Sequence, residues 1–287
     1  MSETRRLNGI IGALERGEHA FLSFAKPEKE EAIVFGESKL DGVVFEMEHN
    51  AWDGLALRDA LYYMVNRRRI VESGSIAPNV TPMVRIPANG IEMNQWLAKQ
   101  ALDLGVYGIV WPHISTVEQA MNAVTSCRYP SPPEYPLHHP AGQRGDGPNN
   151  PARYWGMSNA DYYACADVWP LNPKGEVFVT LMIEDSLGIK NLADILKEVP
   201  GIGCILIGEG DLSQELGHPR QYDHPIVREA MDTIVARCKE ANVPVGHPHA
   251  SSANLQELID IGYRVLFTAP TRSFSDLETG RDLIIRT

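Results

Sequence analysis

The segment VFVTLMIEDSLGIKNLADILKEVPGIGCILIGEGDLSQEL, residues 177–216, determines the fold that the sequence predicts. Its apolar runs 177–183 and 203–208 are typical of buried strands, and the amphipathic run 187–198 between them is typical of a helix. A strand, a helix and a second strand in this order form a βαβ unit, in which the two strands are parallel. Acidic residues follow both strands, Glu184 after the first and Asp211 after the second.

The same alternation of strand and helix runs along the whole chain. Predicted strands cover 20–25, 42–47, 81–86, 108–112, 177–183, 203–208, 243–246 and 264–269. Predicted helices cover 27–36, 56–66, 93–104, 115–125, 187–198, 225–241, 251–261 and 275–285. Eight strands, each followed by a helix, predict a (β/α)8 TIM barrel of class α/β, as one domain over residues 1–287.

Three local features refine this prediction. An additional helix over 5–16 should cap the floor of the barrel. The spacings Asn89–Glu92 and Ser115–Glu118 match a capping box and should begin two of the helices. The segment 128–175 interrupts the alternation, and its prolines and aromatic residues predict an ordered active-site loop with a short helix over 159–168.

Composition excludes several classes of protein. The 287 residues are 44% hydrophobic and 22% charged, as in a soluble globular domain. A net charge of -11 disfavours nucleic-acid binding, and no apolar run is long enough to cross a membrane. The four cysteines form no CxxC pair, and the first residues lack the apolar region of a signal peptide, so we expect a cytoplasmic protein.

Polar residues at the strand ends predict the site, because chemistry in such barrels takes place at the C-terminal ends of the strands. Glu184 and Asp211 should be neighbours there and could hold a divalent ion, although acids at these positions could also cap helices. Arg85 ends a strand and needs an anion, either a structural acid or a substrate oxygen. His49 could act as a base oriented by a carboxylate, or could be an ordinary loop histidine.

Other residues near the strand ends should line the substrate pocket. Backbone N–H groups at Gly208 and Gly210 could hold a carboxylate, since the segment lacks the lysine of a phosphate loop. The remaining pocket candidates are Pro112, His113, His247 and His249. The two histidines of the HPH segment share one side of their strand, and we expect them to contact substrate rather than metal.

Several motifs resemble those of the HpcH/HpaI aldolase family. FEMEHN (45–50) is similar to the family's strand-end E-H motif, and PMVRIP (82–87) to its V-V-R-x-P. GQRGDG (142–147) resembles its R-G-x-G loop, and GIGCILIGEGDLSQELGHP resembles its I-G-P-x-D-L-S segment. The resemblance extends from about residue 7 to residue 283.

The resemblance implies a metal-dependent aldolase that cleaves a 4-hydroxy-2-oxo acid to pyruvate and an aldehyde, as in the catabolism of aromatic compounds. It implies that Glu184 and Asp211 bind Mg²⁺, Mn²⁺ or Co²⁺ and that Arg85 contacts the keto oxygen of pyruvate. The catalytic histidine would be His49, with Glu46 as its partner, and Arg144 of GQRGDG would contact substrate. It also implies a homohexamer whose subunits exchange the C-terminal helix.

The chain departs from the family pattern at three positions. Glu46 replaces an aspartate, Met182 stands where several relatives have glutamine, and Glu209 replaces the proline of I-G-P. These departures leave other functions open. The same enolate could arise from oxaloacetate decarboxylation or serve a macrophomate-synthase-like reaction. A citrate-lyase β-like enzyme is more distant, and a binding barrel without activity is the non-enzymatic alternative.

Overall fold

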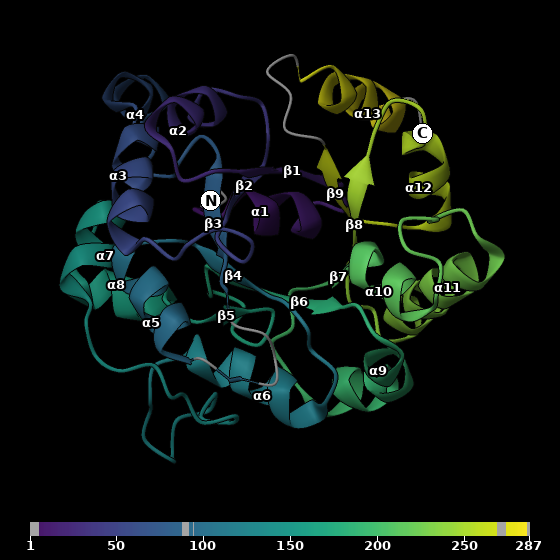
Figure 1. Cartoon of the computed structure of the whole chain (residues 1–287). Coiled ribbons are helices and arrows are strands. Elements are labelled where there is room, and N and C mark those ends of the chain that lie inside the picture. The colour runs from purple at the N-terminus through teal and green to yellow at the C-terminus, as the bar shows by residue number, and fades with distance from the viewer. Residues whose placement is uncertain (1–5, 88–91, 94, 269–273, 286–287) are drawn as a thin grey trace.

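Eight parallel strands close into a barrel in the computed structural model, which describes residues 6–87, 92, 93, 95–268 and 274–285 (Figure 1). The barrel strands are β1 (Ala20–Ala25), β2 (Gly42–Glu46), β3 (Thr81–Arg85), β4 (Gly108–Trp111), β6 (Val177–Ile183), β7 (Cys204–Ile207), β8 (Val245–Ala250) and β9 (Val265–Thr268). Pairing of β1 with β9 and of β4 with β6 completes the ring. The predicted TIM barrel is confirmed.

Helices between the strands surround the barrel (Figure 1). They are α2 (Lys29–Gly36), α3 (Gly54–Met64), α4 (Arg67–Ser73), α5 (Gln95–Leu104), α6 (Val117–Ser126), α9 (Ser186–Glu198), α10 (Glu209–Glu215), α11 (Pro225–Glu240), α12 (Leu255–Ile261) and α13 (Ser275–Ile285). The expected floor helix is α1 (Gly9–Glu15), whose Ile10 and Ile11 are fully buried with the side chains inside the barrel. None of the helices described is long and apolar enough to cross a membrane.

Alternation along each strand determines which side chains face the inside of the barrel. Val44, Met83 and Met182 belong to the cluster of buried side chains within the barrel. Residues two apart on a strand share a face, so Glu46, Arg85 and Glu184 follow them toward the interior. In contrast, Val245 packs in the layer between sheet and helices, so His247 lies on the outer face, and Glu209 at the start of α10 contacts it there.

The segment 128–175 is ordered, and much of it packs on the flank of the barrel. It contains α7 (Asn149–Trp155), α8 (Asn159–Cys165) and the two-residue strand β5 (Val168–Trp169), which pairs with β6. Trp155 is buried and stacks on Tyr107 with ring centroids 4.0 Å apart. Tyr107 directly precedes β4, so this contact lies at the N-terminal end of the strands, away from the mouth. Trp155 and Tyr162 therefore belong to a packing core, whereas Tyr135 and Tyr163 are exposed. The helix predicted over 159–168 ends earlier than expected, at Cys165.

Two predicted helix starts differ from the structure. The capping box of α6 uses Thr116 and Gln119, one residue after the predicted pair Ser115–Glu118, because the Ser115 hydroxyl contacts Asp185 instead. The α5 helix begins at Gln95, and Asn89 of the other predicted box lies outside the described residues, as does Arg5.

The C-terminal helix α13 packs against its own chain. Leu277 is fully buried, and Phe274 meets Phe35 of α2 edge-on at 5.9 Å. Exchange of this helix between subunits stays a prediction, because the structure contains one chain.

Candidate active site

Four carboxylates surround an arginine and a histidine at the mouth of the barrel. These six residues come from consecutive strand ends of the barrel: Glu46 at the end of β2 and Glu48 just after it, Arg85 from β3, His113 after β4, Glu184 after β6, and Asp211 on α10 after β7. Negative charge exceeds positive charge in this cluster even with the imidazole protonated. The mouth therefore attracts a cation.

The guanidinium of Arg85 is fixed on several sides. Its Nε donates to Glu46 Oε2 at 2.6 Å, and its Nη1 lies 2.9 Å from Glu48 Oε2. The Phe24 ring lies 4.8 Å from the guanidinium carbon, and Met182 Sδ lies 3.7 Å from Nη1. Structural acids thus anchor Arg85, which was one of the two possibilities that the sequence left open. Anchoring in this way also holds the charge at the mouth, where it can meet a substrate oxygen.

His113 joins Glu48 to Glu184. Its backbone has a left-handed φ of 55°, and its N–H donates to Glu184 Oε1 at 2.6 Å. Its Nε2 lies 3.5 Å from Glu48 Oε1, and its Nδ1 lies 3.7 Å from Glu184 Oε1. The hydrogen bond with Glu48 and the nearby carboxylates raise the pKa of His113 to about 9. The imidazole therefore carries positive charge at neutral pH in the metal-free protein.

Glu184 is almost completely buried, with 3% of its surface exposed. Burial raises the pKa of its carboxyl to about 7, and the charge and backbone N–H of His113 oppose this rise. Such a shift corresponds to about 3 kcal/mol against ionisation. Gly208 leaves the space that this carboxylate occupies, because a Cβ at that position would lie 2.1 Å from Glu184 Oε2.

The cluster fits a divalent ion. His113, Glu184 and Asp211 each offer a ligand atom, and these atoms all lie within 4.8 Å of one another. Carboxylate oxygens suit Mg²⁺ and Mn²⁺, and an imidazole also suits Co²⁺. A dication beside Glu184 would offset the cost of ionising this buried group. The alternative role as a helix cap does not apply, because Asp185 caps α9 and Asp211 is the third residue of α10.

His49 has a different partner from the predicted one. Its side chain is 67% exposed, and its Nε2 lies 3.6 Å from Glu48 Oε2. Glu46 instead accepts the backbone N–H of His49 at 3.2 Å and uses its other oxygen for Arg85. The sequence reasoning therefore missed Glu48 as a site residue. Its acidic side chain between Glu46 and His49 was the signal that could have identified it.

The structure does not bring His247 and His249 together with the mouth cluster. Both contact Glu209, with His247 Nε2 at 3.5 Å from Oε2 and His249 Nδ1 beside Oε1. This corrects their expected place in the substrate pocket. For His247 the physical reason is strand parity, since the outward face of β8 meets α11 and α12 rather than the interior of the barrel. His249 follows a shift in the pairing of β8 with β9.

Arg144 is also outside the mouth. It is 1% exposed, donates to Asp103 Oδ1 at 3.0 Å and to the Tyr162 hydroxyl at 2.9 Å, and lies over the Tyr129 ring. Asp103 is near the C-terminal end of α5, and helices of this barrel run antiparallel to the strands, so these contacts lie toward the opposite end of the barrel. Arg144 therefore stabilises the inserted segment, which corrects its predicted role in substrate binding.

The two other pocket candidates have different surroundings. Pro112 is buried directly before His113 at the end of β4. Gly210 is exposed on α10, with no atom near the position of an added Cβ. Only Pro112 therefore borders the carboxylate cluster through its neighbour in the chain.

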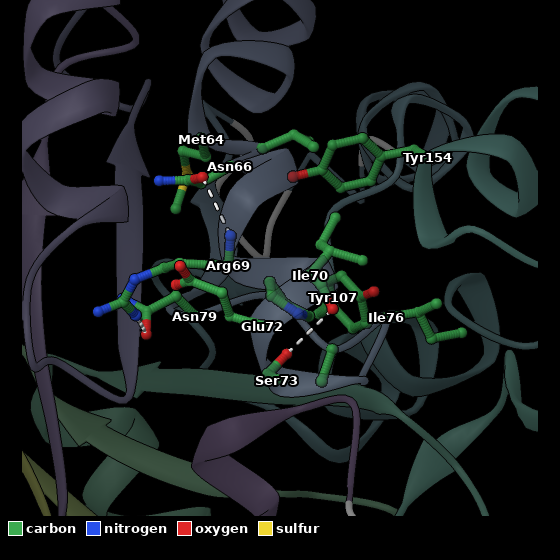
Figure 2. Close-up of a pocket in the computed structure, with 13 residues that line it drawn as sticks. Met64, Asn66, Arg69, Ile70, Glu72, Ser73, Ile76, Asn79, Tyr107 and Tyr154 are labelled. Atoms are coloured by element: carbon green, nitrogen blue, oxygen red, sulfur yellow. Dashed lines mark hydrogen bonds between the residues drawn. The ribbon is translucent and has the colours of Figure 1, made fainter.

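A cavity of about 390 Å³ lies elsewhere, and Figure 2 shows its lining. Arg69 and Ile76, from the connection between α3 and β3, line it together with Tyr107 and Tyr154. Because Tyr107 precedes β4, the cavity is at the N-terminal end of the strands. Its position separates it from the carboxylate cluster, so we do not assign the reaction to it.

Comparison with known proteins identifies the family to which this barrel belongs. Residues 21–266 match the model of the HpcH/HpaI aldolase/citrate lyase family, and the chain belongs to this family. It is 26% identical over 266 residues to a hydroxypyruvate/pyruvate aldolase of Roseobacter denitrificans, covering 92% of this chain and 91% of that protein. It is 30% identical over 213 residues to a 5-keto-4-deoxy-D-glucarate aldolase of Escherichia fergusonii, covering 74% and 70%.

Solved structures show the same fold. A family member from Burkholderia cenocepacia superposes with a TM-score of 0.73 at 26% identity, covering 94% of this chain and 95% of that one. Macrophomate synthase superposes with a TM-score of 0.68 at 22% identity, covering 97% of this chain and 88% of that one, and so supports the fold alone. Family membership and the named relatives place the chain among aldolase-type lyases.

Proposed function

We propose that this chain is a divalent-metal-dependent lyase that cleaves a 4-hydroxy-2-oxo acid to pyruvate and an aldehyde. The observation that carries the proposal is the convergence of Glu184, Asp211 and His113 beside Arg85 at the mouth of the barrel. The names of the relatives as aldolases, one of them for pyruvate, support the reaction class.

The residues divide the work of this reaction. Arg85, held by Glu46 and Glu48, would donate N–H groups to the oxygens of the oxo acid and stabilise the enolate electrostatically. Glu184 and Asp211 would hold a divalent ion, which when bound supplies Lewis-acid stabilisation of the same developing charge. The bond between C3 and C4 breaks, its electron pair passes into the enolate of pyruvate, and the C4 hydroxyl becomes the carbonyl of the aldehyde.

Proton transfer completes the reaction. We propose that His49, or a water beside it, takes the C4 hydroxyl proton, because its imidazole is exposed at the mouth and lies near the Glu48 carboxylate. Protonation of the enolate at C3 then gives pyruvate, and the protons balance. Decarboxylation of oxaloacetate would produce the same enolate without removal of a hydroxyl proton. That second reaction needs no base, so it would not depend on His49.

Substitution of the two acids tests the proposal. We expect Glu184→Gln and Asp211→Asn to lower the Mn²⁺ affinity and the rate of pyruvate release by more than about 100-fold each, because ligands contribute more than their outer partners do. Calorimetric titration with Mn²⁺ measures the first quantity, and a lactate dehydrogenase assay on a panel of 4-hydroxy-2-oxo acids measures the second. Asp194→Asn, at an exposed acid of α9, is the matched control. Near-normal affinity and rate in either ligand variant would show that the metal assignment is wrong.

A further inference from the structure

A second cluster of ionisable groups lies behind the metal-binding helix, on the outer face of the sheet. Glu209, the first residue of α10, is 2% exposed, and its two carboxylate oxygens contact different histidines of β8. None of the steps proposed above uses these three residues. A buried carboxylate is costly to assemble unless it is hydrogen-bonded, and here Glu209 is hydrogen-bonded to His249 and lies 3.5 Å from His247 Nε2.

The backbone of β8 is shaped to bring both histidines to this carboxylate. Between His247 and Ala250 the pairing with β9 shifts, so that three steps along β8 match two steps from Leu266 to Thr268. Such a bulge redirects a side chain locally. His249 lies within this shifted stretch and contacts Glu209.

The proton positions in the cluster follow from its hydrogen bonds. His247 Nδ1 accepts the backbone N–H of His249 at 3.1 Å, so a neutral His247 carries its proton on Nε2, which faces Glu209. Burial lowers the pKa of His247 to about 4, which agrees with a neutral ring. Because its Nδ1 is already an acceptor, a neutral His247 presents an N–H to the Glu209 carboxylate 3.5 Å away and has no lone pair for a metal on that side.

The helix that this cluster holds is short, and its other anchors all follow Asp211: Leu212 and Ser213 are fully buried, and Glu215 accepts the backbone N–H and the hydroxyl of Ser186. The α10 helix has seven residues, and its N-cap Gly208 provides no side-chain cap. Asp211 is exposed, and among the described residues none donates a hydrogen bond to its carboxylate. The position of Asp211 relative to Glu184 therefore depends on where α10 begins.

We propose that Glu209, held by His247 and His249, is a positioning residue that fixes the start of α10 and thereby places Asp211 opposite Glu184. The inference rests on the proposed metal site. Groups that orient a metal ligand from outside the coordination sphere commonly affect affinity by about 10–100-fold. Here the contacts of Glu209 with His247 and His249 act on α10, the helix that carries the proposed ligand Asp211.

The sequence supplies a control for this role. In the I-G-P-x-D-L-S pattern that this segment resembles, proline stands at the position of Glu209, which is the first residue of α10. Proline there fixes φ near its helical value and removes no hydrogen bond within the helix, because the first N–H groups of a helix have no partner in it. A proline at position 209 and the contact of Glu209 with His249 are thus two ways to fix the first residue of α10. We expect one to replace the other.

Four variants test the proposal by Mn²⁺ titration and by amide hydrogen exchange of α10 in the metal-free protein. We expect Glu209→Ala and His249→Ala to weaken Mn²⁺ binding by about 10-fold or more and to speed exchange in 209–215. Glu209→Pro should recover most of the affinity. Gln214→Ala, at an exposed position of the same helix, should behave like the unmodified protein.

The outcomes separate the two proposals. Unchanged affinity and exchange in Glu209→Ala would overturn the positioning role, and so would failure of Glu209→Pro to recover affinity in a folded protein. If the unmodified protein binds no Mn²⁺, the metal assignment itself is wrong, and the exchange of α10 then decides alone whether Glu209 anchors the helix. Loss of binding in Glu184→Gln with normal binding in Glu209→Ala would support the metal site and overturn only the positioning role.

Discussion

Glu48 is the residue that connects the parts of the mouth. Its carboxylate lies within 3.6 Å of nitrogen atoms of Arg85, His113 and His49. It is mostly buried, yet its pKa is lowered, because the hydrogen bond with His113 and the charge of Arg85 outweigh the effect of burial. The carboxylate therefore stays ionised and can hold all three cationic or imidazole groups in place.

His49→Asn distinguishes the two candidate reactions at the level of one residue. We expect it to lower pyruvate release from a 4-hydroxy-2-oxo acid by about 100-fold, a typical effect for loss of a general base. Decarboxylation of oxaloacetate should change by less than about 3-fold, because that reaction removes no hydroxyl proton. Pyruvate formation by the same protein sample on both substrates is the measurement. Equal losses on both would mean that His49 does not act as the base.

At the scale of an element, the turn from β7 into α10 determines whether the metal site can form. Gly208 Cα approaches the Glu184 carboxylate so closely that no side chain fits, while Gly210 two residues later has open space around it. Both glycines lie in one segment, but only Gly208 has to be glycine, because the Glu184 carboxylate occupies the space of a side chain there. The difference provides a matched pair of substitutions.

Gly208→Ala should destabilise the folded protein by about 1–3 kcal/mol and weaken Mn²⁺ binding, because Glu184 must move to admit the methyl group. Gly210→Ala should leave the affinity unchanged and raise stability slightly, since alanine favours a helix. Urea unfolding and Mn²⁺ titration of both variants check this prediction. A Gly208→Ala protein with normal affinity would mean that Glu184 can shift without loss of the site.

At the scale of the whole molecule, the mouth makes stability depend on pH in the absence of metal. Burial raises the pKa of Glu184 from 4.5 to about 7, so its ionisation destabilises the fold as pH rises through this range. The pKa of His113 is raised from 6.5 to about 9, so its stabilising charge is complete below 6.5 and is lost as pH rises through 9. Both effects have the same sign.

We therefore expect the metal-free protein to lose stability between about pH 5 and pH 9. Urea unfolding at several pH values in the presence of a chelator measures the slope. Glu184→Gln should flatten the slope, because the substitution removes one titrating group and one of the charges that, after the hydrogen bond with Glu48, raise the pKa of His113. Added Mn²⁺ should stabilise more at pH 8 than at pH 5.5, since it needs the deprotonated ligands. If the stability of Glu184→Gln and of the unmodified protein changed equally with pH, this account would be contradicted.

The sequence alone determined the barrel and the strand ends that carry its chemistry. Periodicity is a local property, so the runs at 177–183 and 203–208 identified their strands without any knowledge of the neighbours. Position at the C-terminal end of a strand was enough to select Arg85, Glu184 and Asp211, because parallel strands bring these ends together. The family motifs at these positions agreed with that reasoning.

Only the tertiary structure decided which side chains meet. His113 reaches Glu184 through a left-handed backbone at its own position, and His249 contacts Glu209 from a stretch of β8 whose pairing with β9 shifts. Arg144 makes a buried contact with Asp103 on the flank of the barrel, although its motif resembles a substrate-binding loop. Each of these outcomes depends on backbone conformation and on packing between segments far apart in the chain. Residue type and spacing do not encode such contacts, because they arise only when the layers of the barrel assemble.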